Sequence, residues 1–203
     1  GERGATALLA MDSRESGEWI TALLIQGLSE EGVACHYAGL LPTPAVARLC
    51  AARGFTFGVM VSASHNPYQD NGIKFFSGDG YKLPDAVESD IEALLGPMLE
   101  KGPSAPAVQA LRAPKLDLHE EYVGWLLGLW RGGSRAGRKV VVDAANGAAS
   151  HVAPECFRAL GATVVPVGCR PDGRNINEGC GSLHPAVSSH VPLHLVALTL
   201  HHY

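Results

Sequence analysis

The pattern of apolar positions divides the chain into alternating strands and helices. Residues 5–11 are a continuous apolar run, typical of a strand buried on both faces. The next segment has apolar residues at helical spacing and predicts a helix ending at Gly32, and residues 33–37 predict a second strand. Residues 43 to about 53 predict a second helix, and a third strand leads to Ser64. This order predicts an α/β fold with a mixed, mainly parallel sheet and flanking helices.

The same alternation begins again after a proline-rich stretch. A helix is expected from Asp85 to about Leu95, and residues 96–116 predict a surface connector. Residues 118–130 predict a helix whose aromatic stripe packs in the core. A new unit then starts with strands at 139–143 and 163–167 around a helix that Gly161 ends.

This restart predicts two domains. The first covers residues 1–132 and the second residues 137–203. Inside the first, Thr43-Pro44 is expected to form the N-cap and first turn of one helix, and Asp85 is expected to cap another. The second domain reads as the start of a unit similar to the first, and its pattern diverges after residue 185.

Composition narrows the function classes. The 203 residues are 46% hydrophobic and 18% charged, with 24 glycines and 13 prolines, which is typical of a globular, turn-rich protein. A net charge of -4 argues against a nucleic-acid or anionic-membrane partner, and no apolar run is long enough to span a bilayer. Five cysteines without a C-x-x-C pair indicate reduced thiols and a cytoplasmic protein.

The candidate chemistry lies in residues 58–84. A buried strand here ends in Ser62-Ala63-Ser64-His65-Asn66-Pro67, which places hydroxyls at the rim of the sheet, where open α/β folds bind ligands. Ser64 could be a nucleophile, a phosphate acceptor or only a turn residue. The absence of a G-x-S-x-G elbow weakens a serine hydrolase interpretation.

The residues near Ser64 favour the binding of an anion at this loop. His65 and Lys74 offer donors, Gly72 allows close backbone approach, and Arg14 follows another strand of the same predicted sheet. Lys74 is either an exposed edge-strand residue or a partly desolvated lysine that pairs with phosphate or moves a proton.

Three aspartates have simpler explanations. Asp79 is expected in a turn and Asp85 at a helix start. Asp143 follows a strand and is expected to orient the Asn146-Gly147 turn, with ligand contact as the alternative.

Several segments together resemble the α-D-phosphohexomutase superfamily, and within it the bacterial phosphoglucosamine mutases. They are MDSRESG, LLPTPAVA, VMVSASHNPYQDNGIKFFSGDGYKLPD, VVVDAANGAAS and PDGRNINEGCGSLHP, in the family's order. The resemblance covers residues 5 to about 185 and is far longer than a short motif match.

The resemblance implies an intramolecular phosphotransferase. The serine before His-Asn-Pro, here Ser64, is a phosphoserine in the family, and it interconverts glucosamine 6-phosphate and glucosamine 1-phosphate through a bisphosphate. The product leads toward cell-wall amino sugars. By the same resemblance His65 and Lys74 are catalytic, with Lys74 a general acid or base. Arg14, Asn66 and Gly72 bind the phosphorylated hexosamine, and Mg²⁺ neutralises charge.

The sequence also departs from the family pattern. The opening G-T-D-G-I-R-G segment is absent, and residues 186–203 stand where a D-G-D-x-D-R metal loop is expected, so Ser64 would be the remaining Mg²⁺ ligand, through its phosphate. We therefore expect a truncated or frame-shifted fragment. Whether the full-length protein forms a homo-oligomer stays open.

Two other functions remain open at this point. A phosphomannomutase or phosphoglucomutase of the same superfamily would share the chemistry but not the sugar. A non-catalytic α/β module that binds a phosphorylated ligand would share the fold but carry no phosphate on Ser64.

We expect the 203-residue chain alone to lack mutase turnover, because the carboxylates of the metal loop are missing from it. A coupled assay of glucosamine 1-phosphate formation with the purified chain checks this. Turnover clearly above background would show the expectation to be wrong.

Overall fold

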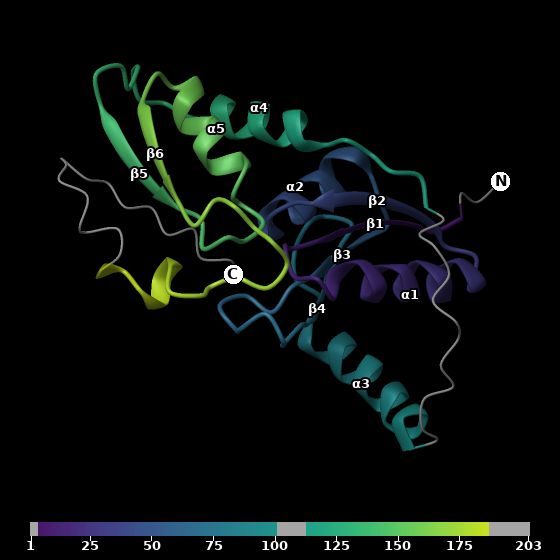
Figure 1. Ribbon diagram of the computed structural model, residues 1–203. Coiled ribbons are helices and arrows are strands. Elements are labelled where there is room, and N and C mark those ends of the chain that lie inside the picture. Colours follow the sequence, from purple (N-terminus) through teal and green to yellow (C-terminus); the bar gives the residue numbers. More distant parts are fainter. Residues whose placement is uncertain (1–3, 101–112, 187–203) are drawn as a thin grey trace.

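A four-stranded sheet forms the centre of the molecule. The computed structural model describes residues 4–100 and 113–186. The strands run in the order β2-β1-β3-β4; β1 is parallel to β2 and β3, and β4 is antiparallel to β3 (Figure 1). Their bounds are β1 Thr6–Met11, β2 Ala34–Leu40, β3 Phe57–Val61 and β4 Ile73–Ser77. This confirms the mixed, mainly parallel sheet.

Helices cover both faces of this sheet, which explains why β1 does not alternate. Ala7 and Leu9 pack in one core cluster with residues of α1 (Gly17–Glu30), and Leu8 and Ala10 pack in another with residues of α2 (Thr43–Arg53). All four side chains are fully buried. Burial on both faces is the condition that turns a strand into a continuous apolar run.

Both helices end at the glycines that the sequence predicts, whereas α2 does not begin with the Thr43 cap that was expected. Gly32 and Gly54 take the left-handed φ values of +79° and +69° that close a helix. The residue preceding α2 is the extended Pro42, so Thr43 is its first helical residue and not its cap. The Thr43 hydroxyl is buried and has no hydrogen-bond partner among the described residues.

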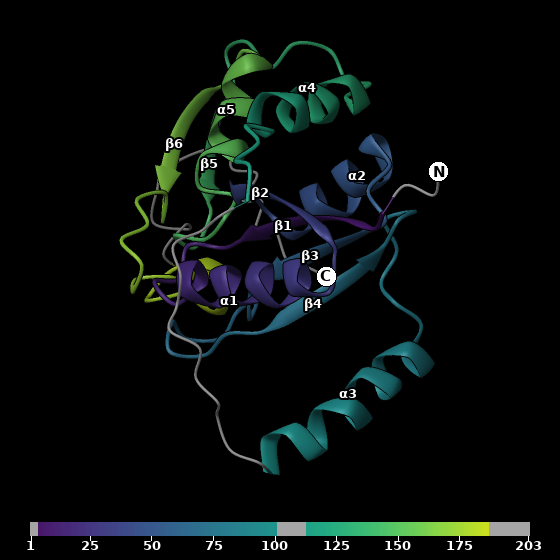
Figure 2. The same cartoon turned by 90° about the vertical axis from the view of Figure 1, so that its right-hand side faces the viewer.

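Helix α3 (Asp85–Glu100) runs five residues beyond its expected end at Leu95 and contains Pro97. The start of the predicted connector is therefore helical, while residues 101–112 lie outside the described part of the chain. Figures 1 and 2 both show α3 standing away from the sheet. Its Leu94 side chain is 68% exposed.

Helix α4 (His119–Leu129) carries the aromatic stripe predicted for the core. Tyr122 is buried and Trp125 and Leu126 are partly buried against the main cluster, which confirms the packing. Leu129 is the exception, because its side chain is 52% exposed.

The second unit is a two-stranded parallel sheet. Strands β5 (Lys139–Asp143) and β6 (Thr163–Val167) flank α5 (Val152–Ala159), and a 3-10 turn follows at Gly181–Leu183. Helices α4 and α5 lie side by side in both views. Val152 of α5 belongs to the core cluster of the first sheet. The division at residues 132–137 stays a prediction, and the expected divergence after 185 falls almost wholly outside the described residues.

None of the described helices is long and apolar enough to cross a membrane.

Candidate active site

The order of the strands fixes where a site can form. After β1 the chain passes to β2 on one side, and it returns to β3 on the other side of β1. Ligands bind open α/β sheets in the crevice beyond the carboxyl ends of the strands, at such a reversal. Asp12 and Arg14 follow β1 here, and Ser62 and Ser64 follow β3. A backbone hydrogen bond of 3.0 Å from Asp12 to Val61 joins the two strand ends.

Ser64 has an unusual backbone conformation. Its φ is +55°, a left-handed value that costs a non-glycine residue about 1–3 kcal/mol unless the surroundings impose it. The residue is half-buried, and its amide donates to the Ser62 hydroxyl at 3.3 Å. Backbone strain of this kind clusters at active sites.

Arg14 is committed to protein groups. The residue is 1% exposed, and its guanidinium forms an ion pair with Asp12. Its Nη2 donates to the carbonyl oxygens of Ser64 at 3.2 Å and Asn66 at 2.8 Å. These contacts occupy Nη1 and Nη2, whereas the buried Nε has no partner among the described residues. Arg14 thus holds two carbonyls of the loop that carries Ser64, and its expected phosphate contact stays a prediction.

A second donor reaches the same two carbonyls from the other sheet. Asn177, in the connection after β6, donates from Nδ2 to the Ser64 oxygen at 3.0 Å and to the Asn66 oxygen at 2.9 Å. The sequence analysis assigned no role to Asn177, although the residue lies in the PDGRNINEGCGSLHP segment. A further signal is that asparagine tolerates the left-handed conformation, and the φ of Asn177 is +61°.

Lys74 lies on β4 directly opposite Met60. Burial lowers the pKa of its ammonium; the charge of Asp12 raises this pKa and that of Arg14 lowers it. Met60 is the last residue but one of β3, so Lys74 lies near the carboxyl end of that strand. A lysine with a lowered pKa exchanges a proton more readily near neutral pH, so a proton-transfer role remains consistent with its position.

The remaining predicted residues have distinct places. His65 is exposed and lines a hollow of about 380 Å³ with Tyr68, Arg174 and Asn177. The Asn66 side chain donates to Asp70 at 3.0 Å, so its amide is engaged inside the loop.

Gly72 closes the Ser64 loop. Its carbonyl accepts from the Ser62 amide at 2.8 Å. A Cβ at this position would lie 3.0 Å from the Ser62 oxygen, so a side chain would push the two strand ends apart. The close approach at Gly72 is thus made to the Ser62 backbone, and its expected contact with a ligand stays a prediction.

Two of the three aspartates, Asp79 and Asp143, take the simpler roles. Buried Asp143 accepts from the amides of Ala145 at 2.9 Å and Gly181 at 2.8 Å, which confirms that it orients the turn. Asp79 accepts from the Ser77 hydroxyl and the Tyr81 amide within a turn. Asp85 is the first helical residue of α3 and not its cap, as for Thr43 in α2.

The described side chains do not form a metal site. Among them, no group of three or more His, Cys, Asp or Glu residues is placed to hold a metal ion. All five cysteines are free.

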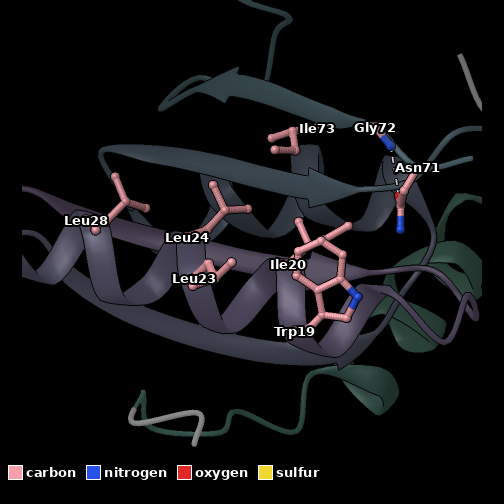
Figure 3. Close-up of a pocket in the computed structure, with 9 residues that line it drawn as sticks. Trp19, Ile20, Leu23, Leu24, Leu28, Asn71, Gly72 and Ile73 are labelled. Atoms are coloured by element: carbon pink, nitrogen blue, oxygen red, sulfur yellow. Dashed lines mark hydrogen bonds between the residues drawn. The ribbon is translucent and has the colours of Figure 1, made fainter. Parts of the chain in front are cut away.

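A larger hollow of about 700 Å³ lies between α1 and the start of β4 (Figure 3). Figure 3 shows Trp19, Leu23 and Leu24 of α1 facing Ile73, with Asn71 at one end. Its lining is almost wholly apolar and holds no acid, base or nucleophile. Asn71 also donates to the Ser16 hydroxyl at 2.8 Å, which ties the far end of the Ser64 loop to α1.

Comparisons with known proteins agree with this architecture. Residues 2–97 match the family model for phosphoglucomutase/phosphomannomutase, alpha/beta/alpha domain I. Residues 2–97 belong to this family. It is 47% identical over 191 residues to a phosphoglucosamine mutase of Desulforudis audaxviator and 46% identical over 183 residues to one of Corynebacterium aurimucosum. These alignments cover 92% and 90% of this chain, but it spans only 42% and 41% of the relatives' length.

Solved structures show the same family fold. A phosphoglucomutase/phosphomannomutase family protein from Burkholderia thailandensis matches with a TM-score of 0.63 at 25% identity, covering 84% of this chain and 38% of that one. A Thermus thermophilus protein, named provisionally as a phosphomannomutase, matches with a TM-score of 0.73 at 22% identity. That match covers 97% of this chain and 46% of the other, and it supports the fold alone.

Lys74 should titrate at a lower pH than Lys82. Burial lowers the pKa of Lys74 from 10.5, whereas hydrogen bonding to Glu88 raises that of Lys82. Following the two side chains by NMR as the pH rises checks the order.

The lowered pKa of Lys74 also predicts a pH dependence of stability. Between the pKa of Lys74 in the folded protein and its ordinary value of 10.5, the unfolded state binds more protons than the folded state. The free energy of unfolding should therefore rise with pH in that window. Lys74→Met should remove this rise, and an unchanged slope would argue against a desolvated Lys74.

Proposed function

We propose that this chain carries the phosphoserine site of a phosphoglucosamine mutase. The proposed reaction interconverts glucosamine 6-phosphate and glucosamine 1-phosphate through a phosphorylated Ser64 and a bisphosphate intermediate. The identity of nearly half to phosphoglucosamine mutases over about nine-tenths of the chain supports the choice of sugar. Phosphomannomutase or phosphoglucomutase activity is the alternative within the same family.

The observation that carries the proposal is the backbone conformation of Ser64 and its position in the sheet. The residue follows a buried strand at the reversal of the sheet, has a φ of +55°, and has its carbonyl held by Arg14 and Asn177. A rigid serine at this rim suits in-line phosphoryl transfer, which depends on positioning more than on covalent activation.

In the proposed transfer, the Oγ–P bond of phosphorylated Ser64 breaks as a sugar hydroxyl oxygen bonds to phosphorus. The hydroxyl proton passes to neutral Lys74, whose lowered pKa favours that form, and from there to the leaving Ser64 oxygen. The bisphosphate then turns round and the transfer runs in reverse: Ser64 takes the other phosphoryl group, and its hydroxyl proton passes through Lys74 to the departing sugar oxygen. Exposed His65 lies next to Ser64 and is placed to donate to phosphate oxygens.

Magnesium would neutralise phosphate charge, but the described residues do not fit a complete site for it. Ser64 could contribute one ligand through its phosphate. We therefore derive no step through the metal. The expected cytoplasmic role in amino-sugar synthesis for the cell wall belongs to the same proposal.

The direct test is phosphorylation of Ser64. The purified chain is incubated with glucosamine 1,6-bisphosphate, and intact mass and peptide mapping are followed over time. We expect one phosphoryl group on Ser64, none in Ser64→Ala, and normal loading in Ser89→Ala on exposed α3. Lys74→Met should slow loading by roughly 10²–10⁴-fold, the usual contribution of a general acid or base.

Failure of Ser64 to accept phosphate, or equal loading of Ser64→Ala, would contradict the proposal. Covalent labelling of Ser64 by a fluorophosphonate would favour a hydrolase instead. Equal loading from glucose or mannose 1,6-bisphosphate would keep the chemistry and overturn the choice of sugar.

A further inference from the structure

Four residues other than glycine have positive φ values in the described part of the chain. They are Ser64 at +55°, Ala145 and Asn146 at +52°, and Asn177 at +61°. They come from three separate segments, yet hydrogen bonds join them. The Asn177 amide donates to the Ala145 carbonyl at 2.8 Å, and its side chain donates to the Ser64 carbonyl at 3.0 Å. Strained residues that gather at one place mark a site whose geometry the surroundings impose.

The turn after β5 fixes the position of Asn177. Asp143 holds the turn and accepts from Gly181 further along the same connection. The Asn146 side chain donates to the Asn175 carbonyl at 3.2 Å, two residues before Asn177. Asn177 is therefore held by the second sheet while its amide group reaches the first.

Additional contacts hold the two units together beside this point. The Ser13 hydroxyl donates to the Asn146 carbonyl, and the Glu15 amide donates to the Gly173 carbonyl at 2.9 Å. Glu15 also forms an exposed ion pair with Arg174 at 2.7 Å. Residues 13–15 follow directly on Asp12, so the same short segment anchors Arg14 and the second unit.

We propose that Asn177 is a positioning residue for the Ser64 loop, supplied by the second unit. This rests on the proposed phosphoserine function, which it deepens by adding a residue outside residues 58–84. The carbonyls of Ser64 and Asn66 each accept from Nδ2 of Asn177 and from Nη2 of Arg14. With both carbonyls drawn to one side, Ser64 is kept in its left-handed conformation.

Asparagine meets two requirements at position 177. Its amide nitrogen carries two donors, one for each carbonyl, and its backbone tolerates a positive φ. Asn177→Gly removes the donors and keeps the backbone tolerance. Asn177→Asp keeps size and shape but puts an acceptor oxygen in place of Nδ2, facing the two carbonyl oxygens. The two variants therefore separate the hydrogen bonds from the fold of the connection, and His184→Ala, exposed in the same connection, is the control.

Two measurements test the proposal on the full 203-residue chain. Hydrogen exchange of peptides covering residues 62–71 should become about tenfold faster in Asn177→Gly, as expected for loss of about 1.4 kcal/mol of local protection, and faster still in Asn177→Asp. Exchange in β1 and β5 should stay unchanged. Loading of Ser64 from glucosamine 1,6-bisphosphate should be slower at saturation by a similar factor, with the half-saturating concentration unchanged.

The exchange measurement does not depend on the phosphoserine function. If the unsubstituted chain fails to load but Asn177→Gly loosens the 62–71 loop, the proposed function fails and the loop contact stands. If the unsubstituted chain loads and Asn177→Gly matches it in both exchange and loading, the positioning role is overturned. Equal effects from His184→Ala would also overturn it.

Discussion

Two backbone carbonyls, those of Ser64 and Asn66, are the point on which the site depends. Each accepts a hydrogen bond from buried Arg14 in the first unit and from Asn177 in the second. These bonds hold Ser64 at a φ that a serine does not otherwise favour. The chemistry proposed for Ser64 therefore depends on residues from both sheets.

The surrounding fold supplies the groups that meet at these carbonyls. Because β1 lies between β2 and β3, the segments after β1 and β3 emerge at one edge, with Arg14 on one and Ser64 on the other. Antiparallel β4 returns Lys74 to that edge, where burial lowers the pKa of its ammonium. The contact between α4 and α5 keeps the second sheet beside the first.

Local features of the site could be predicted, whereas contacts between distant segments could not. The apolar run before Ser62 and the small polar residues after it were enough to place Ser64 at the rim of the sheet. An arginine in a turn is usually exposed, and nothing in the sequence indicates that Asp12 pairs with Arg14 inside the protein. Asn177 lies 113 residues from Ser64 and carries no periodic signal, so only the fold reveals their contact.

Arg14 and Asn177 donate to the same two carbonyls, so the effects of substituting them should be coupled. A double-mutant cycle tests this coupling most directly. Arg14→Met and Asn177→Gly each leave both carbonyls with one donor, whereas the combined variant leaves them without either. The free energy of opening the 62–71 loop, measured by hydrogen exchange, should therefore fall by more than the sum of the single effects, with a coupling of roughly 0.5–3 kcal/mol. Additive effects would contradict the joint hold on Ser64.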